Sequence, residues 1–269
     1  MRIGTKEFDT DHNTYVMGIL NVTPDSFSDG GKFRELDRAL YQAEKMIIEG
    51  ASIIDVGGES TRPGCGQVSA QEEINRIAPV IRGIKERFDT IISIDTYKAE
   101  TANEAVKLGA DLINDIWGLK KDPAMGKLIA ETGVACCLMH NRAKADGYSD
   151  FMKDMKKDLE ETIALAHKAA ISQDKIILDP GVGFGKGYQE NLLAIRNVGE
   201  LKEFGYPVLL ATSRKSVIGT ALDLDVEQRV EGTIATTVMA VMAGCGFVRV
   251  HDIKENRRAI LMTEAIIGR

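Results

Sequence analysis

The chain is poor in the residues that support small cross-linked folds. Its 269 residues include only four cysteines and six prolines. The cysteines are Cys65, Cys136, Cys137 and Cys245. They form no Cys-x-x-Cys pair and are few for the length of the chain, which excludes a zinc-ribbon framework and a disulfide-rich mini-protein. We therefore expect reduced cysteines in a cytoplasmic protein.

Long hydrophobic runs and an excess of positive charge are also missing. No stretch approaches the roughly 18 apolar residues of a membrane span, and the first residues hold no apolar core of signal-peptide length. The 34 basic residues are outnumbered by 40 acidic ones, which gives a formal net charge of −6. Because nucleic acids and anionic membranes both require clustered positive charge, we expect neither as a partner. A small anionic substrate is compatible with this charge, since a few arginines can dominate one site.

After residue 14 the sequence alternates regularly between short β-branched runs and stretches with helical periodicity. The candidate strands are Tyr15–Leu20, Ser52–Val56, Ile91–Ile94, Leu112–Asn114, Val134–Met139, Lys175–Leu178, Pro207–Ala211 and Phe247–Val250. Several are uninterrupted apolar runs, which are typical of strands buried on both faces. Eight such units in about 255 residues predict a single (β/α)8 TIM barrel. The alternative, a doubly wound open sheet, usually has fewer strands.

No linker rich in proline, serine or charge divides the chain. We therefore expect one barrel domain over residues 15–269. Residues 1–14 precede the first strand, and we expect them to form a short N-terminal extension that covers the bottom of the barrel. In this fold the chemistry lies at the C-terminal ends of the strands, so polar residues at those ends are the candidates for a site.

Polar side chains end or follow every candidate strand. In chain order they are Asn21, Asp55, Asp95, Asn114 with Asp115, His140, Asp179, Ser213-Arg214-Lys215-Ser216, and Arg249 with His251-Asp252. Each alone is compatible with an ordinary helix cap, and for Asp55 or Asp115 alone that interpretation is preferred. Polar residues at all eight strand ends together indicate a binding site at the barrel mouth.

Three loops that follow strands are rich in glycine: NVTPDSFSDGG at 21–31, GGESTRPGCG at 57–66 and DPGVGFGKG at 179–187. Glycine permits a ligand to approach the backbone closely. Two of these loops exceed the usual connection of about 4–6 residues, which is typical of binding loops. The Gly-x-Gly-x-Gly spacing at 181–185 differs from the dinucleotide fingerprint, so we expect no nicotinamide cofactor.

Three of the strand-end residues suit a flat heterocycle. A buried carboxylate such as that of Asp179 can accept two parallel N–H bonds from a 2-aminopyrimidinone edge, and Asn114 offers both a donor and an acceptor. Together with Asp95 they fit a guanine-like or pterin-like ring. The remaining candidates suit an anion: Thr61, Arg62, Arg249 and His251 bring donors and positive charge for a phosphate or diphosphate.

Two further features point to a metal ion and to a carboxylate. The side-chain carbonyl of Asn21 can ligate Mg²⁺, which prefers oxygen and typically shares diphosphate oxygens. The segment Ser213–Ser216 leads into a short helical stretch, whose N-terminal N–H groups favour a carboxylate.

The chain resembles the dihydropteroate synthases, the folate-pathway enzymes that sulfonamides target. The segments that carry the resemblance are MGILNVTPDSFSDGG at 17–31, IIDVGGESTRPG at 53–64, SIDT at 93–96, INDIWG at 113–118, LMH at 138–140, ILDPGVGFGK at 177–186, SRKS at 213–216 and VRVHDI at 248–253. They occur in the family's order and span nearly the whole chain. NVTPDSFSDGG and GESTRPG are the most specific of them.

The resemblance implies a transferase that condenses (7,8-dihydropterin-6-yl)methyl diphosphate with p-aminobenzoate in a dissociative substitution. The implied pterin contacts are Asp95, Asn114, Met139, Asp179, Phe184 and Lys215. The implied diphosphate contacts are Thr61, Arg62, Arg249 and His251, and the implied p-aminobenzoate contacts are Phe27, Thr61, Pro63 and Ser216. Asp95, Lys215 and Arg249 would act in catalysis, and Asn21 would ligate Mg²⁺ as the cofactor. The resemblance also implies a homodimer.

Three alternatives compete with this interpretation. A methyltetrahydrofolate:corrinoid methyltransferase would share the pterin slot but needs no diphosphate site. A non-catalytic pterin-binding protein would not need Asn21 and Arg249. A Schiff-base aldolase would use Lys215, for which a cationic contact to substrate is the preferred interpretation. One local departure from the family, Asn141-Arg142-Ala143-Lys144 after His140, leaves the contribution of the fifth loop open.

Overall fold

Eight parallel strands form a closed barrel in the computed structural model, which describes residues 1–22, 32–59, 66–145 and 147–269, with only the backbone of 32–34. The strands are β3 (Tyr15–Asn21), β4 (Ile53–Gly57), β5 (Ile91–Asp95), β6 (Leu112–Asp115), β7 (Ala135–Met139), β8 (Ile176–Asp179), β9 (Leu209–Leu210) and β10 (Phe247–Val250). Their order in the sheet is β8-β7-β6-β5-β4-β3-β10-β9. A parallel bridge between Leu178 and Val208 joins the two ends of this order, so the sheet closes. The predicted (β/α)8 barrel is confirmed.

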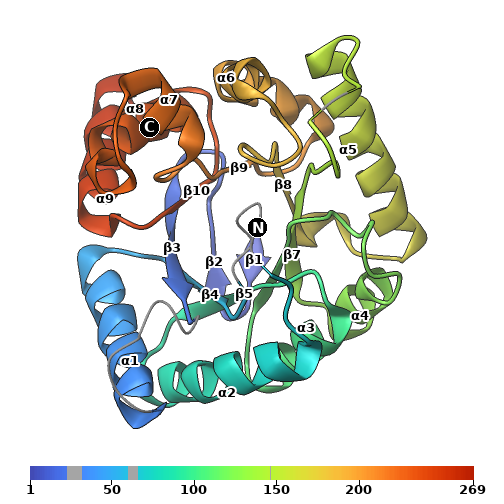
Figure 1. The fold of residues 1–269 in the computed structure, drawn as a ribbon, viewed down its shortest axis with the longest axis vertical. Coiled ribbons are helices and arrows are strands. Elements are labelled where there is room, and N and C mark those ends of the chain that lie inside the picture. The colour runs from blue at the N-terminus through green and yellow to red at the C-terminus, as the bar shows by residue number, and fades with distance from the viewer. Residues whose placement is uncertain (23–31, 60–65, 146) are drawn as a thin grey trace.

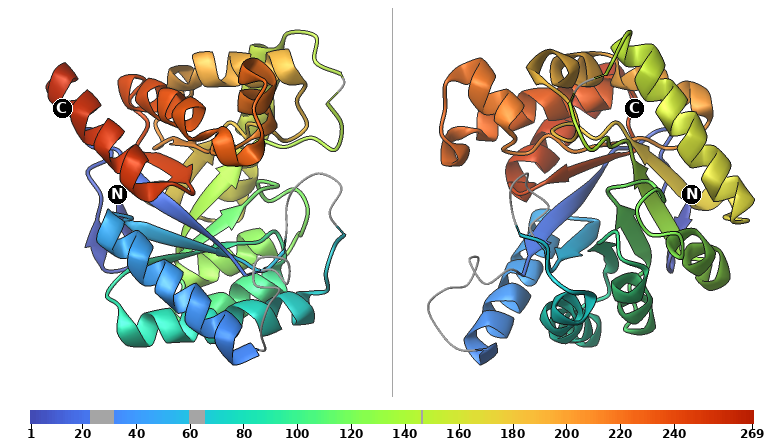
Figure 2. Two further views of the ribbon diagram at one scale, coloured as in Figure 1. Left: turned by 60° about the vertical axis from the view of Figure 1, so that its left-hand side comes forward. Right: turned by 45° about the vertical axis from the view of Figure 1, so that its right-hand side comes forward.

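Helices surround the strands in chain order (Figure 1). They are α1 (Lys32–Glu49), α2 (Ala70–Arg87), α3 (Ala99–Lys107), α4 (Met125–Thr132), α5 (Phe151–Lys168), α6 (Tyr188–Arg196), α7 (Ser216–Leu222), α8 (Val230–Met242) and α9 (Ile253–Ile267). Short 3₁₀ helices, at Gln173–Lys175, Val198–Phe204 and Val226–Gln228, fill the later connections. The two side views show the helices packed around the outside of the strands (Figure 2).

Helix α2 shows how the sequence determines where a helix begins and which face it buries. Ser69 is its N-cap and accepts a hydrogen bond from the Glu72 N–H at 3.1 Å, which satisfies one of the unpaired N–H groups of the first turn. Ile77, Ile81 and Ile84 lie at helical spacing and are fully buried. The apolar stripe of the sequence is therefore the face that packs on the barrel.

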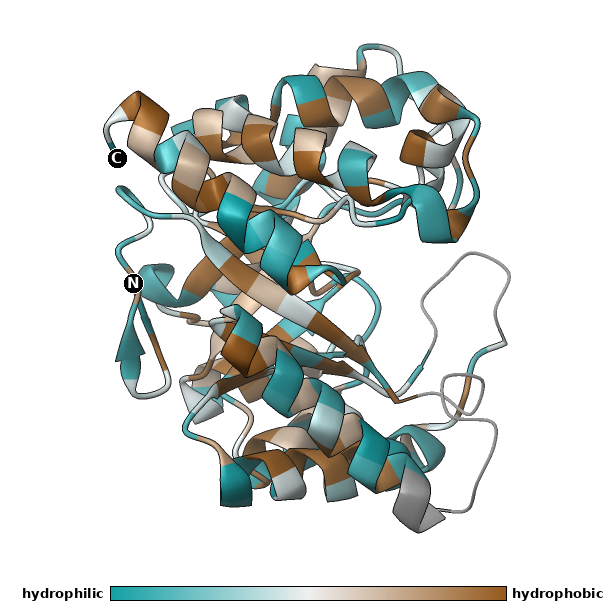
Figure 3. Ribbon diagram, turned by 90° about the vertical axis from the view of Figure 1, so that its left-hand side faces the viewer, coloured by the Kyte–Doolittle hydropathy of each residue, from teal (hydrophilic) through white to brown (hydrophobic). Residues whose placement is uncertain are grey.

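The apolar core has two layers. One lies between the strands and the surrounding helices, and Figure 3 shows strands that are mostly brown or pale beside helices whose residues alternate between teal and brown. The other lies within the barrel, where side chains from the barrel strands meet two from the N-terminal extension. Its buried members are Ile3, Phe8, Met17, Ile53, Ile91, Leu112, Ala135, Cys137, Ile177, Leu209, Ala211 and Phe247. The barrel is thus a packed core rather than a pore.

The predicted strand ends agree with the structure to within one residue for seven strands. The exception is β9, which covers two residues instead of the five predicted. Pro207 has no N–H to donate to a ladder, and Val208 makes only an isolated bridge to Leu178. The predicted strand therefore begins too early, and it also ends too late, because Ala211 lies beyond β9.

The first residues pack against the bottom of the barrel. Strands β1 (Arg2–Ile3) and β2 (Lys6–Glu7) form an antiparallel hairpin. The ring centroid of Phe8 lies 4.8 Å from that of Tyr15 and 5.7 Å from that of Phe247, two residues that begin barrel strands. These contacts support the expected cover, while the division at residue 14 stays a prediction. Within the described part of the chain, no helix is long and apolar enough to cross a membrane.

Candidate active site

Four of the predicted pterin residues occupy the C-terminal ends of neighbouring strands. Asp95 ends β5, Asn114 lies in β6, Met139 ends β7 and Asp179 ends β8. The parallel register pairs Asp95 with Asn114 and Met139 with Asp179. All four residues are buried. The fold thus gathers side chains that lie up to 84 residues apart in sequence into one half of the barrel mouth.

Arg249 joins this region to the opposite end of the chain. From β10 its Nε donates to Asp55 Oδ2 at 2.6 Å and its Nη2 donates to Asp95 Oδ2, also at 2.6 Å. The side-chain nitrogen of Asn114 donates to the same Asp55 oxygen at 3.3 Å. We call these four residues, Asp55, Asp95, Asn114 and Arg249, the Arg249 cluster. It holds two carboxylates and one guanidinium, so its formal charge is −1 when all are ionised.

Buried polar atoms without a hydrogen-bond partner lie in the Arg249 cluster and beside it. Over the described residues, the buried side-chain atoms without a hydrogen-bond partner are Asp55 Oδ1, Ser93 Oγ and Asp95 Oδ1. Buried polar atoms are nearly always paired in folded proteins, because an unpaired one costs free energy. Three such atoms on two adjacent strands are typical of a site that completes its hydrogen bonds with a ligand.

Burial also shifts the pKa values in this cluster. It raises the pKa of Asp95 to about 7, and the nearby carboxylate of Asp55 adds to this effect while Arg249 opposes it. For Arg249 itself, burial works against the charged form, but the carboxylates of Asp55 and Asp95 outweigh it and raise the pKa. The guanidinium is therefore positively charged at any pH at which the protein is folded. Such shifts are frequent at functional sites.

Asp179, Lys215 and Phe184 form the next part of the mouth. Asp179 Oδ1 accepts a hydrogen bond from the Gly181 N–H at 2.7 Å. The Lys215 Nζ donates to the carbonyl of Val182 and lies 5.0 Å from the centroid of the Phe184 ring. Burial lowers the pKa of Lys215 to about 8, and the carboxylate of Asp179 opposes this shift. Burial likewise raises the pKa of Asp179, against the positive charge of Lys215.

Glycine is required in the loop that carries Phe184. Gly181 has a φ of +68°, and a Cβ built there would lie 1.9 Å from the carbonyl oxygen of His140. At Gly185, with a φ of +55°, a Cβ would lie 2.4 Å from the carbonyl oxygen of Arg142. The glycine-rich segment 179–187 is therefore a loop packed tightly on its neighbour, the loop after β7.

Three predicted residues lie around this centre. Asn21 ends β3, and a Cβ built on Gly57 would lie 3.5 Å from its Oδ1 and 3.8 Å from Asp95 Oδ2. His251 follows β10, and its Nδ1 lies 2.9 Å from the hydroxyl oxygen of Ser213. Ser216 is the first residue of α7 and is exposed.

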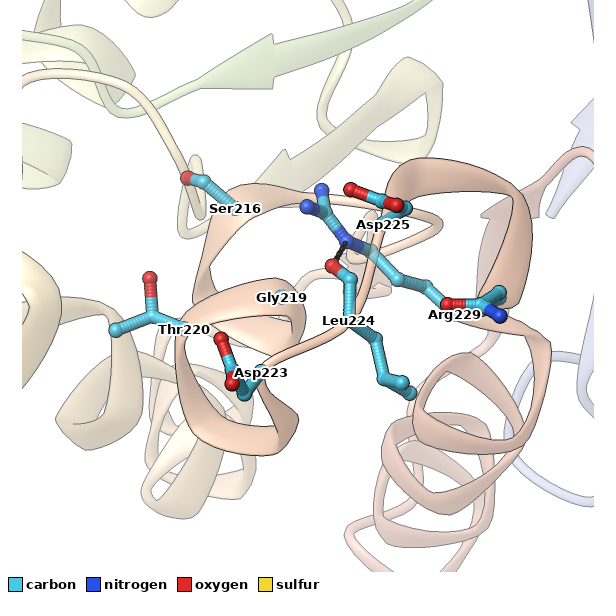
Figure 4. A pocket seen from close by; sticks show the side chains of 8 residues that line it. Ser216, Gly219, Thr220, Asp223, Leu224, Asp225 and Arg229 are labelled. Atoms are coloured by element: carbon cyan, nitrogen blue, oxygen red, sulfur yellow. Dashed lines mark hydrogen bonds between the residues drawn. The ribbon is translucent and has the colours of Figure 1, made fainter.

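A cavity of about 400 Å³ opens beside Ser216 (Figure 4). Its lining is Ser216, Gly219, Thr220, Asp223, Leu224, Asp225, Gln228 and Arg229. Arg229 closes one side, since its Nε donates to the Leu224 carbonyl at 3.0 Å. Its Nη1 donates to the Arg214 carbonyl, also at 3.0 Å, which links the cavity wall to the segment before α7. The cavity thus adjoins the predicted p-aminobenzoate side of the mouth.

Some predicted residues lie outside the described part of the chain. They are Phe27, Thr61, Arg62 and Pro63, and the same holds for Cys65. Their assignments stay predictions. Among the residues that are described, no group of three or more His, Cys, Asp or Glu side chains is placed to hold a metal ion.

Two charged residues of this region, Asp55 and Lys186, have a place in the structure that the sequence did not predict. Asp55, for which an ordinary cap is the preferred interpretation when it is taken alone, is fully buried and binds Arg249. Lys186, which is also buried, received no role. A signal was present for both, because a charged residue inside an apolar strand or a packed glycine-rich loop needs a partner. The identity of that partner could not be read from the sequence.

Comparison with known proteins places the chain among enzymes that handle pterins. A family model described as pterin binding enzyme matches residues 17–251. A protein of Clostridium beijerinckii named dihydropteroate synthase is 57% identical over 270 residues, which cover 100% of both chains. The chain belongs to the dihydropteroate synthase family.

Solved structures of this family share the fold closely. The dihydropteroate synthase of Clostridium difficile, determined in the presence of pteroic acid, has a TM-score of 0.95 and 50% identity, covering 98% of this chain and 100% of that one. The enzyme of Xanthomonas albilineans with 4-aminobenzoic acid has a TM-score of 0.92 and 37% identity, covering 96% of this chain and 94% of that one. The resemblance on which the sequence analysis relied is thereby confirmed, along with the transferase class that it implied.

Proposed function

We propose that this chain condenses (7,8-dihydropterin-6-yl)methyl diphosphate with p-aminobenzoate to give 7,8-dihydropteroate and diphosphate, a step of folate biosynthesis. The observation that carries the proposal is the Arg249 cluster at the mouth of a barrel of this family. It combines a charged guanidinium with unpartnered buried oxygens. A ring with N–H donors and an anionic leaving group would satisfy both.

The pterin would lie against the ends of β5 to β8. Asp179 and Asn114 provide acceptors and a donor for the edge of the ring, while Met139 and Phe184 provide apolar surface. Lys215 is held beside Phe184 and near Asp179, where its charge would contact the oxygen of the ring. The unpartnered Oδ1 of Asp95 would accept a hydrogen bond from the bound ring.

The reaction breaks the bond between the methylene carbon and the diphosphate oxygen, and the electron pair leaves with diphosphate. The amine nitrogen of p-aminobenzoate then attacks the methylene carbon with its lone pair and loses a proton. Asp95 would stabilise the positive charge that develops on the pterin. The two carboxylates occupy Nε and Nη2 of Arg249, and its Nη1 takes part in neither bond, so Nη1 would meet the diphosphate, with His251, Thr61 and Arg62.

Asn21 is the residue that would hold Mg²⁺. Its Oδ1 lies on the same side of Gly57 as the Asp95 carboxylate, so oxygen donors of the kind that Mg²⁺ prefers are present. The absence of a three-residue cluster in the described chain is compatible with an ion held by one protein ligand, diphosphate oxygens and water. When bound, the ion would neutralise charge on the diphosphate.

The p-aminobenzoate would lie toward the outer rim of the mouth, between Ser216 and the predicted residues Phe27, Thr61 and Pro63. The hydroxyl of Ser216, at the beginning of α7 and exposed, can donate to the carboxylate. In this arrangement the pterin lies deeper than its partner. The aromatic amine then reaches the methylene carbon from the open side.

A homodimer, expected from the family resemblance, is also part of the proposal. Apolar side chains are exposed on the two packed helices α8 and α9: Met242 to 67%, Met262 to 62% and Ile266 to 70%. Exposed apolar groups of this kind are typical of an interface between subunits. Replacing Ile266 with lysine should give a monomer in analytical ultracentrifugation if the interface lies there. A cytoplasmic location stays a prediction.

An assay for diphosphate release tests the proposed reaction. Release should require the dihydropterin diphosphate, and dihydropteroate should appear only when p-aminobenzoate is added. The Arg249→Met variant should release little diphosphate, because the leaving group loses its charged contact. Turnover of the wild type with no dependence on p-aminobenzoate would point to another acceptor and would refute the proposed condensation.

A further inference from the structure

A second cluster of charge lies beside the pterin slot, on the loops after β7 and β8 and on helix α5, and its lysine and histidine are buried while its other two members are half-buried. Lys186 Nζ lies 2.7 Å from His140 Nδ1. His140 Nε2 lies 2.9 Å from Asp158 Oδ2, and Arg142 Nε donates to the same oxygen at 2.6 Å. We call these four residues, Lys186, His140, Asp158 and Arg142, the Lys186 cluster. None of them has a role in the proposed reaction.

The hydrogen bonds fix the proton positions in this cluster. Asp158 is ionised, since its bonds to His140 and Arg142 outweigh burial and lower its pKa. It can only accept, so His140 Nε2 carries the hydrogen and Nδ1 is left to accept from Lys186. Burial lowers the pKa of His140 to about 4, which keeps the ring neutral and its Nδ1 available at neutral pH.

Lys186 binds the backbone of the loop that carries Phe184. Besides His140, its Nζ donates to the carbonyl of Gly181 at 2.9 Å and to that of Phe184 at 3.0 Å. These three acceptors match the three hydrogens of an ammonium group, and the carbonyl oxygen of His140 lies further from Nζ, at 3.4 Å. The lysine therefore closes the segment 181–184 into a compact turn, and it anchors this turn to the end of β7 through His140.

The turn is the part of the mouth that would contact the pterin. It contains Phe184, and it contains the Val182 carbonyl that accepts from Lys215. Gly181 donates its N–H to Asp179. One lysine thus fixes the backbone that orients all three of the residues proposed for this side of the ring.

The cost of burying Lys186 argues that it does more than stabilise the fold. Burial lowers its pKa to about 7, so the folded state disfavours the charged form that its three acceptors fit. An apolar side chain of similar length would avoid that cost. Costly buried charges are concentrated at functional sites.

We propose that Lys186 is a positioning residue for pterin binding, which acts by holding the turn 181–184 and hence Phe184 and Lys215 in place. Arg142 and Asp158 support it by fixing the tautomer of His140. The contribution of the fifth loop, which the sequence left open, is then to anchor the sixth. The inference rests on the proposed function, because it presumes that a pterin occupies this slot.

The test compares Lys186→Met with Lys144→Met, a matched control on the exposed part of the fifth loop. Calorimetry with 6-hydroxymethylpterin measures the affinity of the slot directly. Lys186→Met should weaken binding by about tenfold or more, as expected for the loss of hydrogen bonds from a charged donor. The KM for dihydropterin diphosphate should rise in parallel, while the KM for p-aminobenzoate should change little. Lys144→Met should behave like the wild type.

Lys186→Gln sharpens the result, because its amide keeps two donors and should restore part of the affinity. If Lys186→Met does not fold, the affinity of Lys186→Gln is compared with that of the wild type instead. Wild-type pterin affinity in Lys186→Met, or in Lys186→Gln should that be the variant available, would overturn the inference, as would an equal rise in both KM values together with a lower unfolding midpoint. A wild type that binds the pterin but releases no diphosphate would refute the proposed reaction instead, and the affinities would still decide on Lys186.

Discussion

The two clusters of buried charge at the barrel mouth differ in how completely their members satisfy one another. In the Lys186 cluster, described side chains and backbone carbonyls account for each nitrogen of His140 and for the ammonium of Lys186. In the Arg249 cluster, Asp55 Oδ1 and Asp95 Oδ1 have no partner among the described residues. The two clusters lie on neighbouring parts of one barrel, yet only the Arg249 cluster has unpaired atoms.

The difference separates a cluster that holds the site from one that receives the ligand. A saturated network resists movement, because each bond that breaks leaves a buried group unpaired. An unsaturated one retains free energy that a suitable ligand can recover on binding. We therefore expect substitutions in the Arg249 cluster to affect chemistry and stability together, and substitutions in the Lys186 cluster to affect binding through geometry.

The largest effect should come from Arg249→Met. It leaves the carboxylates of Asp55 and Asp95 buried at the centre of the mouth without a counter-ion. Breaking a buried ion pair in this way typically costs about 3–5 kcal/mol of unfolding free energy, and turnover should fall below detection. Urea unfolding and diphosphate release measure the two effects.

Arg214→Met is the matched control for that variant. Arg214 also pairs with a carboxylate, through Nε to Asp252 Oδ2 at 3.0 Å, but its side chain is 34% exposed. A pair that water reaches in part contributes less than a fully buried one, so this variant should lose less stability than Arg249→Met. Equal losses of stability in the two arginine variants would contradict the special position given to the Arg249 cluster.

Asp179→Asn should have the next largest effect, on pterin affinity. The amide replaces one acceptor with a donor, and a lost hydrogen bond to a charged acceptor costs about 1.5–3 kcal/mol. Calorimetry with 6-hydroxymethylpterin gives the change. The control is Asp115→Asn at the end of β6, since both Asp115 oxygens are bound by backbone N–H groups, of Trp117 at 2.9 Å and Leu119 at 2.7 Å. Weaker pterin binding in the control, or unchanged binding in Asp179→Asn, would contradict the assignment of Asp179 as a pterin contact.

The fold could be predicted from the sequence because each barrel strand has a recognisable local pattern. Each is a short apolar run that ends in a polar residue, and that pattern needs no knowledge of the neighbouring strand. The same rule found Asp95, Asn114 and Asp179, because the fold sends all strand ends to one face. Only the bounds of β9 were predicted poorly from this pattern, because Pro207 has no N–H to donate and the strand is therefore shorter.

The partners within the site could not be predicted, because they form between distant parts of the chain. Asp55 and Arg249 are 194 residues apart, and His140 and Lys186 are 46 apart. A polar residue at a strand end can bind the backbone of its own loop, as Asp115 does, or a distant arginine, as Asp55 does, and which of the two occurs depends on the side of the sheet that it faces. Strands buried on both faces carry no alternation that would tell the two sides apart.

The pH dependence of stability should separate the contributions of the two clusters. The pKa of His140 is about 4 in the folded state against 6.5 when unfolded, so the unfolded chain binds more protons between these values. Stability from this group is present above pH 6.5 and is lost as the pH falls, by about 2 kcal/mol at the middle of the window. Asp95, with a pKa raised from 3.8 to about 7, has the opposite slope over the whole of this window, because its folded state binds the proton more tightly.

Comparing His140→Gln with the wild type isolates the first contribution. Urea unfolding at a series of pH values should show that the variant loses less stability than the wild type between pH 6.5 and pH 4. The variant is less stable at neutral pH, but the quantity that matters is the slope. Parallel curves for the two proteins would mean that His140 is not held neutral by its surroundings.

The smallest effect should come from Ser216→Ala at the outer rim. The hydroxyl would donate one hydrogen bond to the carboxylate of p-aminobenzoate, and because Ser216 is exposed, water can replace that bond at a cost of about 1 kcal/mol. The KM for p-aminobenzoate should therefore rise severalfold while that for the pterin diphosphate stays constant. Thr220→Val is the control, since Thr220 lies one turn further along α7 and lines the same cavity (Figure 4). If both variants raise the KM for p-aminobenzoate, the substrate extends into the cavity. If neither does, the carboxylate lies elsewhere, and Ser216 belongs to the surface of the barrel rather than to its site.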